Sequence, residues 1–256
     1  MTAELRSAMT GLLSLACVEE QALLAGCASG PGHDPAGPGY RGGSPDTWAA
    51  APLVAHNNEF KSQQAERIVA IRSGQVPPAF GEVDHGSVEL YRRYSAQSAD
   101  EVMVGCRRVT AELIEGTWAL PDEDLLDPAR HPWLNGRLLW LQIIVRGFWH
   151  PTGHLGGYYL GHGQPERAVA LQAHALATAR YLGAPPAAAG MAGYSLACAQ
   201  ARSGQPAEAA RTLAEAIQAN PDLRARQPGS RPRLVARGLT GQDWWRFSAE
   251  AEAPCR

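Results

Sequence analysis

Apolar residues recur at helical spacing along most of the chain, and strand-like alternation is weak throughout. In residues 2–25 the apolar positions fall on one helical face: Leu5, Met9, Leu12, Leu13, Leu23 and Leu24. Further helical patterns cover residues 44–74, 87–94, 98–116 and 133–160, and a glycine- and proline-rich loop at 26–43 separates the first two. The pattern predicts an all-α protein built on an antiparallel four-helix bundle.

Two of these predicted helices carry start signals. Ser98 is followed three residues later by Glu101, which is the spacing of a capping box. The second helix has Ser44 and Pro45 at its expected start, but Pro52 either kinks that helix or marks its true beginning.

The C-terminal part contains an internal repeat. Residues 155–175 and 196–216 align without gaps and share the triplet Gly-Gln-Pro at 163–165 and 204–206. Small residues recur at the same places, Ala168 with Ala209 and Ala175 with Ala216. This pattern is typical of tetratricopeptide (TPR) helical hairpins. Two units are too few for a free solenoid, so we expect TPR-like hairpins packed against the bundle, with domains at 1–163 and 164–256.

Composition narrows the class of protein. The chain has 256 residues, 45% of them hydrophobic, and a net charge of −2, which favours neither nucleic acid nor an anionic membrane as partner. The N-terminal segment carries Glu4, Glu19 and Glu20 and does not resemble a signal peptide, and we expect no membrane span. Five scattered cysteines without a CxxC motif predict a reduced, cytoplasmic protein in which Cys106 is a packed thiol.

Three histidines carry the most specific chemical signal. His150 and His154 lie four residues apart and share one face of a helix. The H-E-x-x-H protease motif is excluded because Pro151 stands where the glutamate would be. His56 lies with Phe60 on the apolar stripe of another helix, and a bundle brings such stripes together. Three imidazoles from two helices predict a divalent metal with open positions, as in a catalytic site.

Pro151 should also distort the helix that carries two of these histidines. Its ring clashes with the carbonyl group four residues earlier, which belongs to Gly147. We therefore expect a kink beside the metal ligands.

The segments "TWAAAPLVAH" and "WLNGRLLWLQIIVRGFWHPTGH", which end at His56 and His154, resemble the DinB/YfiT-like metalloenzymes. The resemblance covers about residues 1–163, and the TPR-like extension resembles those appended to some members. It implies a four-helix bundle and zinc as the metal, with nickel or iron as alternatives. It also implies bacillithiol- or mycothiol-dependent transferase, isomerase or hydrolase activity, without choosing among them.

From these observations we interpret the protein as an enzyme, a thiol-dependent transferase or isomerase that acts on a small electrophilic metabolite with a low-molecular-weight thiol such as mycothiol. A hydrolase that uses metal-bound water and a non-catalytic binding or scaffold protein remain the alternatives. A homodimer is left open.

Three side chains beside the histidines are candidates for catalysis. Glu59 is the candidate proton acceptor, with Gln63 further along that side of the helix. Arg146 and Tyr158, one turn outside the histidine pair, are candidates to orient an anionic or carbonyl group of the substrate. The alternative interpretation is that Arg146 is solvated and Tyr158 is packed.

Overall fold

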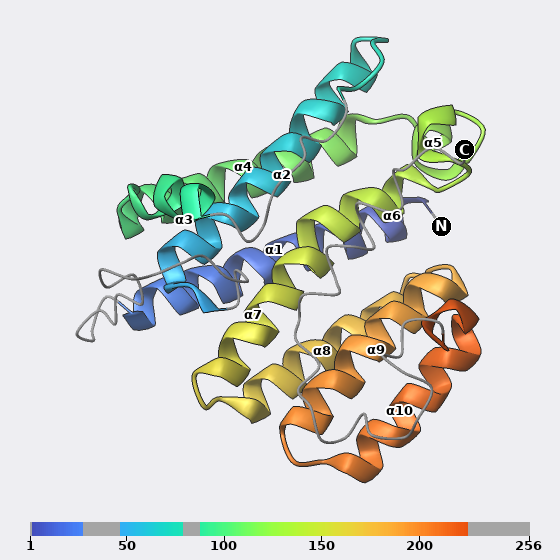
Figure 1. Ribbon diagram of the computed structural model, residues 1–256. Coiled ribbons are helices and arrows are strands. Elements are labelled where there is room, and N and C mark those ends of the chain that lie inside the picture. The colour runs from blue at the N-terminus through green and yellow to red at the C-terminus, as the bar shows by residue number, and fades with distance from the viewer. Residues whose placement is uncertain (1, 28–46, 79–87, 225–256) are drawn as a thin grey trace. The chain divides into compact units, whose positions relative to one another are not determined.

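The computed structural model describes residues 2–27, 47–78 and 88–224, and these residues form helices and connections without a β-strand (Figure 1). The prediction of an all-α protein is confirmed for this part of the chain. The described residues divide into two compact units, with the division between Pro151 and Thr152 inside one helix. The predicted boundary at 163 lies two residues after the end of that helix.

The first unit contains three long helices and several short ones. Its elements are α1 (Thr2–Cys27), α2 (Ala50–Arg72), α3 (Val88–Ser95), α4 (Ala99–Ala119), α5 (Asp122–Leu126), the 3-10 helix η2 (Pro132–Leu134), α6 (Leu139–Ile144), the π-helix η3 (Val145–Trp149) and the start of α7 (His150–Gly161). Helix α4 contacts both α1 and α2, and η3 contacts α1 and α2.

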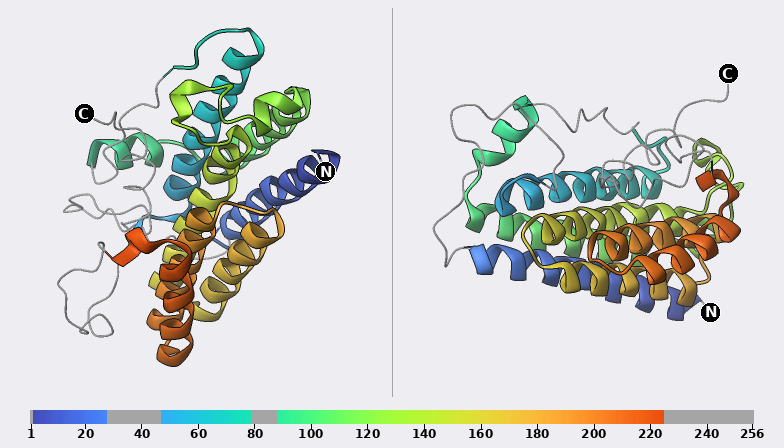
Figure 2. Two further views of the ribbon diagram at one scale, coloured as in Figure 1. Left: turned by 90° about the vertical axis from the view of Figure 1, so that its right-hand side faces the viewer. Right: turned by 60° about the horizontal axis from the view of Figure 1, so that its bottom comes forward.

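Paired contacts define the directions of these helices. Arg6, near the start of α1, donates hydrogen bonds to the carbonyl groups of Thr117 and Leu120 at the end of α4, so these two helices are antiparallel. Helices α2 and α4 instead run parallel, because Asn58 bonds the carbonyl of Val102 toward their starts and Gly116 packs on Ile68 toward their ends. Two views in Figure 2 show this arrangement.

The parallel pair differs from the strictly antiparallel order that we predicted from the sequence. The connection between α2 and α4 spans residues 73–98 and includes α3, which packs on α2. A connection of this length lets the chain return to its starting end before α4 begins.

The predicted start signals are resolved differently at the two helices. Ser98 is the N-cap of α4, and its side chain and that of Glu101 form the reciprocal capping-box bonds. Helix α2 begins at Ala50, with Pro52 in its first turn, where the missing N–H has no intrahelical partner to lose. Pro52 therefore marks the start of the helix. Ser44 and Pro45 lie outside the described residues.

The predicted helix at 133–160 is divided into α6, η3 and α7. The N–H of His150 donates to the carbonyl of Val145, five residues back, which is the π-helical pattern. This wider turn comes immediately before Pro151 and adjusts the backbone at the place where proline would otherwise clash. Gly147 lies inside it, and a Cβ there would stand 2.2 Å from Leu13 of α1. The predicted distortion is therefore present, as a π-turn packed closely on its neighbours.

The second unit consists of the rest of α7, α8 (Pro165–Tyr181), α9 (Pro186–Arg202), α10 (Pro206–Ala219) and the 3-10 helix η4 (Pro221–Arg224). Helix α9 packs against both α8 and α10. Gln172 of α8 donates to the carbonyl of Thr152 in α7, and a Cβ at Gly156 would stand 2.6 Å from the Gln172 amide. The glycine therefore permits the close approach of α7 and α8.

The repeated Gly-Gln-Pro triplet forms the same turn twice. Gly163 and Gly204 have φ values of 70° and 75°, a left-handed conformation that glycine adopts without strain. The N–H of the following glutamine donates to a carbonyl five residues back, which closes the helix end as in a Schellman motif. Pro165 and Pro206 then occupy the first position of α8 and α10. Each copy of the triplet thus ends one helix and begins the next, α7 and α8 in the first copy and α9 and α10 in the second.

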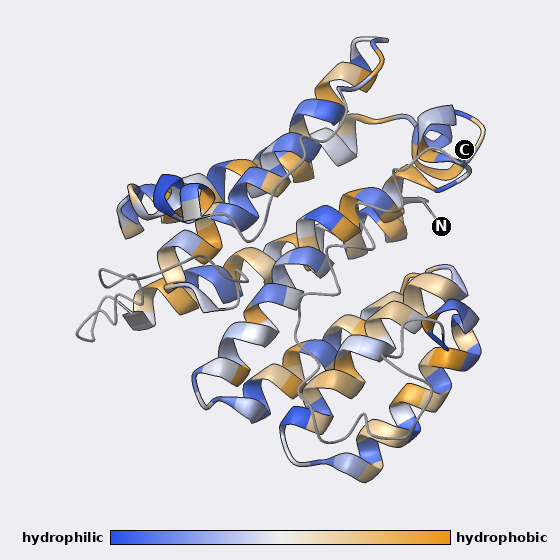
Figure 3. Ribbon diagram, viewed as in Figure 1, coloured by the Kyte–Doolittle hydropathy of each residue, from blue (hydrophilic) through white to orange (hydrophobic). Residues whose placement is uncertain are grey.

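Helix α1 is long and apolar enough to cross a membrane by length and composition, over residues 3–26, contrary to our expectation that no segment would be. Signal sequences and core helices meet the same test. In the first unit α1 buries Leu13 and Leu24 together with the charged side chains of Arg6 and Glu20. Helix α2 also has both polar and apolar residues along its length, as the colours in Figure 3 show. The buried charges are typical of a core helix with polar partners.

Helices α9 and α10 pack closely at Gly190, and this contact can be tested. A Cβ at Gly190 would stand 2.7 Å from the Cβ of Asn220 and 2.9 Å from the carbonyl oxygen of Ala216. Because that oxygen belongs to the backbone, it cannot rotate away. We expect Gly190→Ala to lower the free energy of unfolding by about 1–3 kcal/mol, measured by urea denaturation.

The matched control is Gly11→Ala on the exposed side of α1, where a new Cβ meets no atom within 4 Å. Higher helix propensity should make that variant more stable by about 0.5–1 kcal/mol. Equal stabilisation in both variants would contradict the close packing at Gly190.

Candidate metal centre

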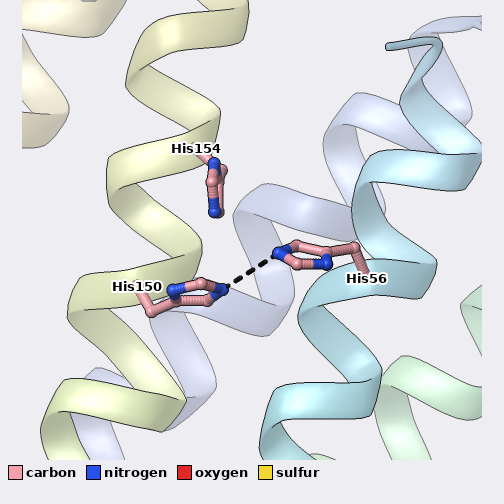
Figure 4. A group of neighbouring side chains, drawn as sticks. All are labelled: His56, His150 and His154. Atoms are coloured by element: carbon pink, nitrogen blue, oxygen red, sulfur yellow. Dashed lines mark hydrogen bonds between the residues drawn. The ribbon is translucent and has the colours of Figure 1, made fainter. Parts of the chain in front are cut away.

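The three predicted histidines come together in the structure. His56 projects from α2, His150 is the first residue of α7, and His154 follows one turn later on the same helix. Figure 4 shows the three imidazoles directed into the space between these helices. Their exposed fractions are 0%, 4% and 3%, so the cluster is almost fully removed from solvent.

The distances within the cluster suit a metal ion. One ligand nitrogen from each histidine can be chosen so that all lie within 4.8 Å of one another. The Nε2 atoms of His56 and His150 are 3.3 Å apart. Two nitrogens bound to one tetrahedral zinc ion at 2.0–2.1 Å stand about 3.3–3.4 Å apart, so this pair already has the spacing of two ligands.

The donor set is also chemically suitable. Neutral imidazole is a common ligand of zinc, nickel and iron, and three protein ligands leave at least one position open. The hydrogen bond between His56 and His150 needs a proton on one of the two Nε2 atoms. Metal binding would replace that proton, since both nitrogens must offer a lone pair. The residues present therefore fit a divalent ion.

Aromatic side chains surround His56 and His150. Phe60, one turn after His56, stacks on the His150 ring with centroids 4.0 Å apart and an interplanar angle of 18°. Trp48 meets the His56 ring at 5.8 Å, and Tyr94 of α3 meets it at 5.7 Å. These contacts fix the orientation of the imidazoles and exclude water from their flanks.

Glu59, the predicted proton acceptor, is held by several donors. Its Oε2 accepts hydrogen bonds from the Tyr94 hydroxyl at 2.6 Å and from Arg93 at 2.5 Å. Its Oε1 accepts a longer bond from Gln63 at 3.4 Å. Burial, followed by the bond to Glu59, raises the pKa of Tyr94, which keeps its phenol protonated. Glu59 thereby anchors a ring that contacts His56.

Arg146 is buried in η3, one turn before His150, and its exposed fraction is 3%. Its guanidinium lies 5.0 Å from the centroid of the Phe60 ring. Since Phe60 also stacks on His150, Arg146 places a buried positive charge in the same neighbourhood. The alternative that this side chain is solvated is therefore wrong.

Tyr158 has a different environment. Its ring is buried in the second unit and stacks on His162, with centroids 3.8 Å apart and an interplanar angle of 14°. This agrees with the interpretation of Tyr158 as a packed residue. Its proposed role in orienting substrate stays a prediction.

Sequence reasoning missed two residues of this region. Tyr94 lies in the last turn of the short helix α3, whose polar composition gave no sign of a site. Gln64 lies two turns after His56, is fully buried, and neither of its amide atoms has a hydrogen-bond partner among the described residues. A buried amide of this kind is a donor and an acceptor for a ligand or for water. A search for polar residues that continue the stripe of His56 and Phe60 would have found it.

A groove of about 490 Å³ lies on another side of α2, between it and α4. Its lining includes Ser62, Arg72, Arg108 and Glu112 and none of the three histidines. The groove is therefore separate from the metal centre.

No family model, no curated protein and no solved structure matches this chain. The candidate metal centre therefore rests on the residues and their geometry.

The cluster predicts binding of one divalent ion. Untagged protein incubated with zinc or nickel and then desalted should carry about one equivalent by elemental analysis. The His154→Ala variant removes one of three ligands. Loss of a residue that only contacts a ligand weakens metal affinity by roughly 10- to 100-fold. Loss of a direct ligand should weaken the metal affinity of this variant by more than that.

The matched control is His174→Ala, because His174 lies exposed on α8 outside the cluster. That variant should bind the metal as the unmodified protein does. Wild-type protein that stays metal-free after incubation would exclude a metal centre.

Proposed function

We propose that the protein is a divalent-metal-dependent enzyme of the DinB/YfiT type, acting as a thiol-dependent transferase or isomerase on a small electrophilic substrate. The observation that carries the proposal is the buried cluster of His56, His150 and His154, with two of its nitrogens already at ligand spacing. Three imidazoles from two helices leave room for an exogenous ligand, as a catalytic site requires.

The arrangement of helices supports the same proposal. We interpret α1, α2, α4 and the continuous run α6–η3–α7 as a four-helix bundle with one long crossover between α2 and α4. We interpret α7–α8 and α9–α10, joined by the repeated Gly-Gln-Pro turn, as TPR-like hairpins. Packing of these hairpins against the bundle remains part of the proposal.

Zinc is our first choice of metal, with nickel or iron as alternatives, because each accepts neutral imidazole. When bound, such an ion supplies Lewis acidity, which lowers the pKa of a thiol or water so that an anionic nucleophile exists at neutral pH. The preference for a thiol such as mycothiol rests on the family resemblance.

The residues around the cluster have distinct proposed roles. Trp48, Phe60 and Tyr94 hold the imidazoles and keep the surroundings dry, which strengthens electrostatic interactions there. Arg146, buried beside Phe60, attracts a negatively charged or carbonyl group of the substrate. Gln64 offers a donor and an acceptor for the same molecule.

Glu59 has two proposed roles that can be separated. Since it accepts bonds from Tyr94 and Arg93, we propose first that it positions the Tyr94 ring against His56. It would act as the proton acceptor through Oε1, which receives only the long bond from Gln63. The test is the pH–rate profile of Glu59→Gln. A lower rate with the same dependence on pH would support the positioning role.

Thiol dependence is the central test of the proposed activity. Metal-loaded protein is offered a panel of small electrophiles with mycothiol, with glutathione or without thiol, and the products are followed by mass spectrometry. We expect conjugate or isomerised product only with a thiol, and at a rate above that of His154→Ala, which holds the ion weakly, mixed with the same total amount of metal. That comparison corrects for uncatalysed reaction with free metal.

Two other results of this assay would favour the alternative functions. Turnover that needs no thiol would make the protein a hydrolase that uses water as nucleophile. Metal binding without turnover of any electrophile would favour a non-catalytic binding or scaffold protein.

A second test concerns Arg146. The Arg146→Met change keeps most of the apolar volume and removes the charge. For an electrophile that carries a carboxylate we expect kcat/KM to fall about 10-fold or more, and for its uncharged analogue we expect little change. Metal content and circular dichroism check that the variant is folded and loaded.

Arg108→Met is the matched control, because Arg108 is exposed and pairs with Glu112 on its own helix. Equal losses on the charged and the uncharged electrophile would assign Arg146 to packing alone.

A further inference from the structure

A second polar cluster lies inside the first unit, away from the three histidines. It consists of Cys17 and Glu20 of α1, Asn57 and Lys61 of α2, and Cys106 of α4. The exposed fraction is 6% for Cys17 and at most 1% for the other four. The proposed metal chemistry uses none of these side chains.

The charged members of this cluster form a buried ion pair. Lys61 is the only lysine in a chain with 23 basic residues, and its ammonium group bonds Glu20 Oε2. Asn57 donates to the other carboxylate oxygen of Glu20 at 2.9 Å. A fully buried ion pair is weak evidence for stability, because desolvation offsets the attraction. Its contacts with the sulfurs suggest a chemical role instead.

The two cysteine sulfurs are in direct contact. Cys17 Sγ and Cys106 Sγ are 3.1 Å apart, and both residues are free thiols. Cys106 Sγ also lies 3.2 Å from Glu20 Oε2 and 3.8 Å from the Lys61 ammonium nitrogen. Gln21 donates to Cys17 Sγ at 3.1 Å. A disulfide needs a sulfur separation of about 2.05 Å, so the two sulfurs must approach by roughly 1 Å.

The surroundings make the two thiols unequal. Hydrogen bonding from Cys106, assisted by the positive charge of Lys61, holds the pKa of Cys17 well below its usual range, although burial opposes this. The bond with Cys17, together with burial and the negative charge of Glu20, raises the pKa of Cys106. The pKa shifts thus favour the thiolate form of Cys17 and the thiol form of Cys106, the pairing of an attacking and a resolving cysteine.

We infer that Cys17 and Cys106 form a reversible disulfide linking α1 to α4, with a small hydroperoxide as the oxidant. The contact between the sulfurs, the donor from Gln21 and the neighbouring ion pair of Glu20 and Lys61 carry this inference. Cys17 is the less buried member of the pair, with an exposed fraction of 6% against 0% for Cys106, so a small oxidant such as hydrogen peroxide would reach it first.

The reaction balances in two steps. The Cys17 thiolate attacks one peroxide oxygen, so that an S–O bond forms, the O–O bond breaks and the departing oxygen takes a proton from water. The sulfur is oxidised by two electrons to a sulfenic acid, and the peroxide is reduced. Cys106 then attacks the Cys17 sulfur, the S–S bond forms, and hydroxide leaves.

Glu20 is placed to handle the proton of the second step. Its Oε2 lies 3.2 Å from the Cys106 sulfur, so it can take the thiol proton as Cys106 attacks and pass it to the leaving hydroxide, which departs as water. With hydrogen peroxide, two thiols and one peroxide give one disulfide and two waters. Two equivalents of a small thiol reverse the oxidation by exchange.

The test isolates the pair by changing the other three cysteines, Cys27, Cys198 and Cys255, to serine. The folded protein is treated with hydrogen peroxide, denatured, and its free thiols are counted. We expect both thiols to disappear together, the intact mass to fall by two hydrogens, and dithiothreitol to restore both. Mass spectrometry of unmodified protein, digested without reductant, should show the peptides containing Cys17 and Cys106 linked.

Single substitutions then assign the order of events. In the same background Cys106→Ser should leave a sulfenic acid on Cys17 that a dimedone probe traps. Cys17→Ser should leave Cys106 unlabelled, because burial and the negative charge of Glu20 still favour its protonated form. Labelling of Cys106 in that variant would overturn the assignment. The inference would also be overturned if Cys17 and Cys106 stayed reduced in peroxide-treated unmodified protein while Cys198 was oxidised.

The pH dependence gives a readout that does not depend on the variants. The titratable and charged groups around the sulfurs are Glu20 on α1, Lys61 on α2 and Cys106 on α4. Because the thiolate is the reactive form, the rate of disulfide formation should fall as the pH is lowered. Its midpoint should lie below the value of about 8.5 of an ordinary thiol. A midpoint at or above that value would contradict the activated Cys17.

Discussion

The helix that carries His150 and His154 has to pass through Pro151, which cannot donate a backbone hydrogen bond. The chain accommodates this residue with the π-turn of η3, in which the N–H of His150 reaches back to Val145. The close packing of Gly147 on Leu13 holds the widened turn in place. The position of His150 opposite His56, and of Arg146 beside Phe60, depends on this local departure from the α-helix.

Features encoded by neighbouring residues could be predicted from the sequence. The capping box of Ser98 and Glu101 and the shared face of His150 and His154 are settled within a few residues. The meeting of His56 with this pair also followed, because both stripes are apolar and must face inward in a helical protein.

Features encoded by distant residues could not be predicted in this way. The parallel run of α2 and α4 depends on how the chain crosses between them, and helical periodicity carries no direction. The contact of Cys17 with Cys106 joins residues 89 positions apart. The sequence around Cys106 has Arg107 and Arg108 beside it but no histidine at a readable spacing, and we therefore interpreted Cys106 as a packed thiol. The bond from Tyr94 to Glu59 likewise joins residues that lie far apart in the sequence, so it could not be predicted.

Helix α2 has polar groups on two adjoining flanks, His56 toward α7 and Lys61 toward α1. More than half of its residues are buried, so no broad exposed face orients the helix as it would an amphipathic surface helix. The rotation of α2 about its own axis is instead set by its polar contacts. A rotation by one residue would turn Lys61 away from Glu20 and leave a buried charge uncompensated, at a cost of several kcal/mol. The ion pair thus acts as a rotational lock, and Lys61, a residue outside the histidine cluster, helps to fix the direction in which His56 points.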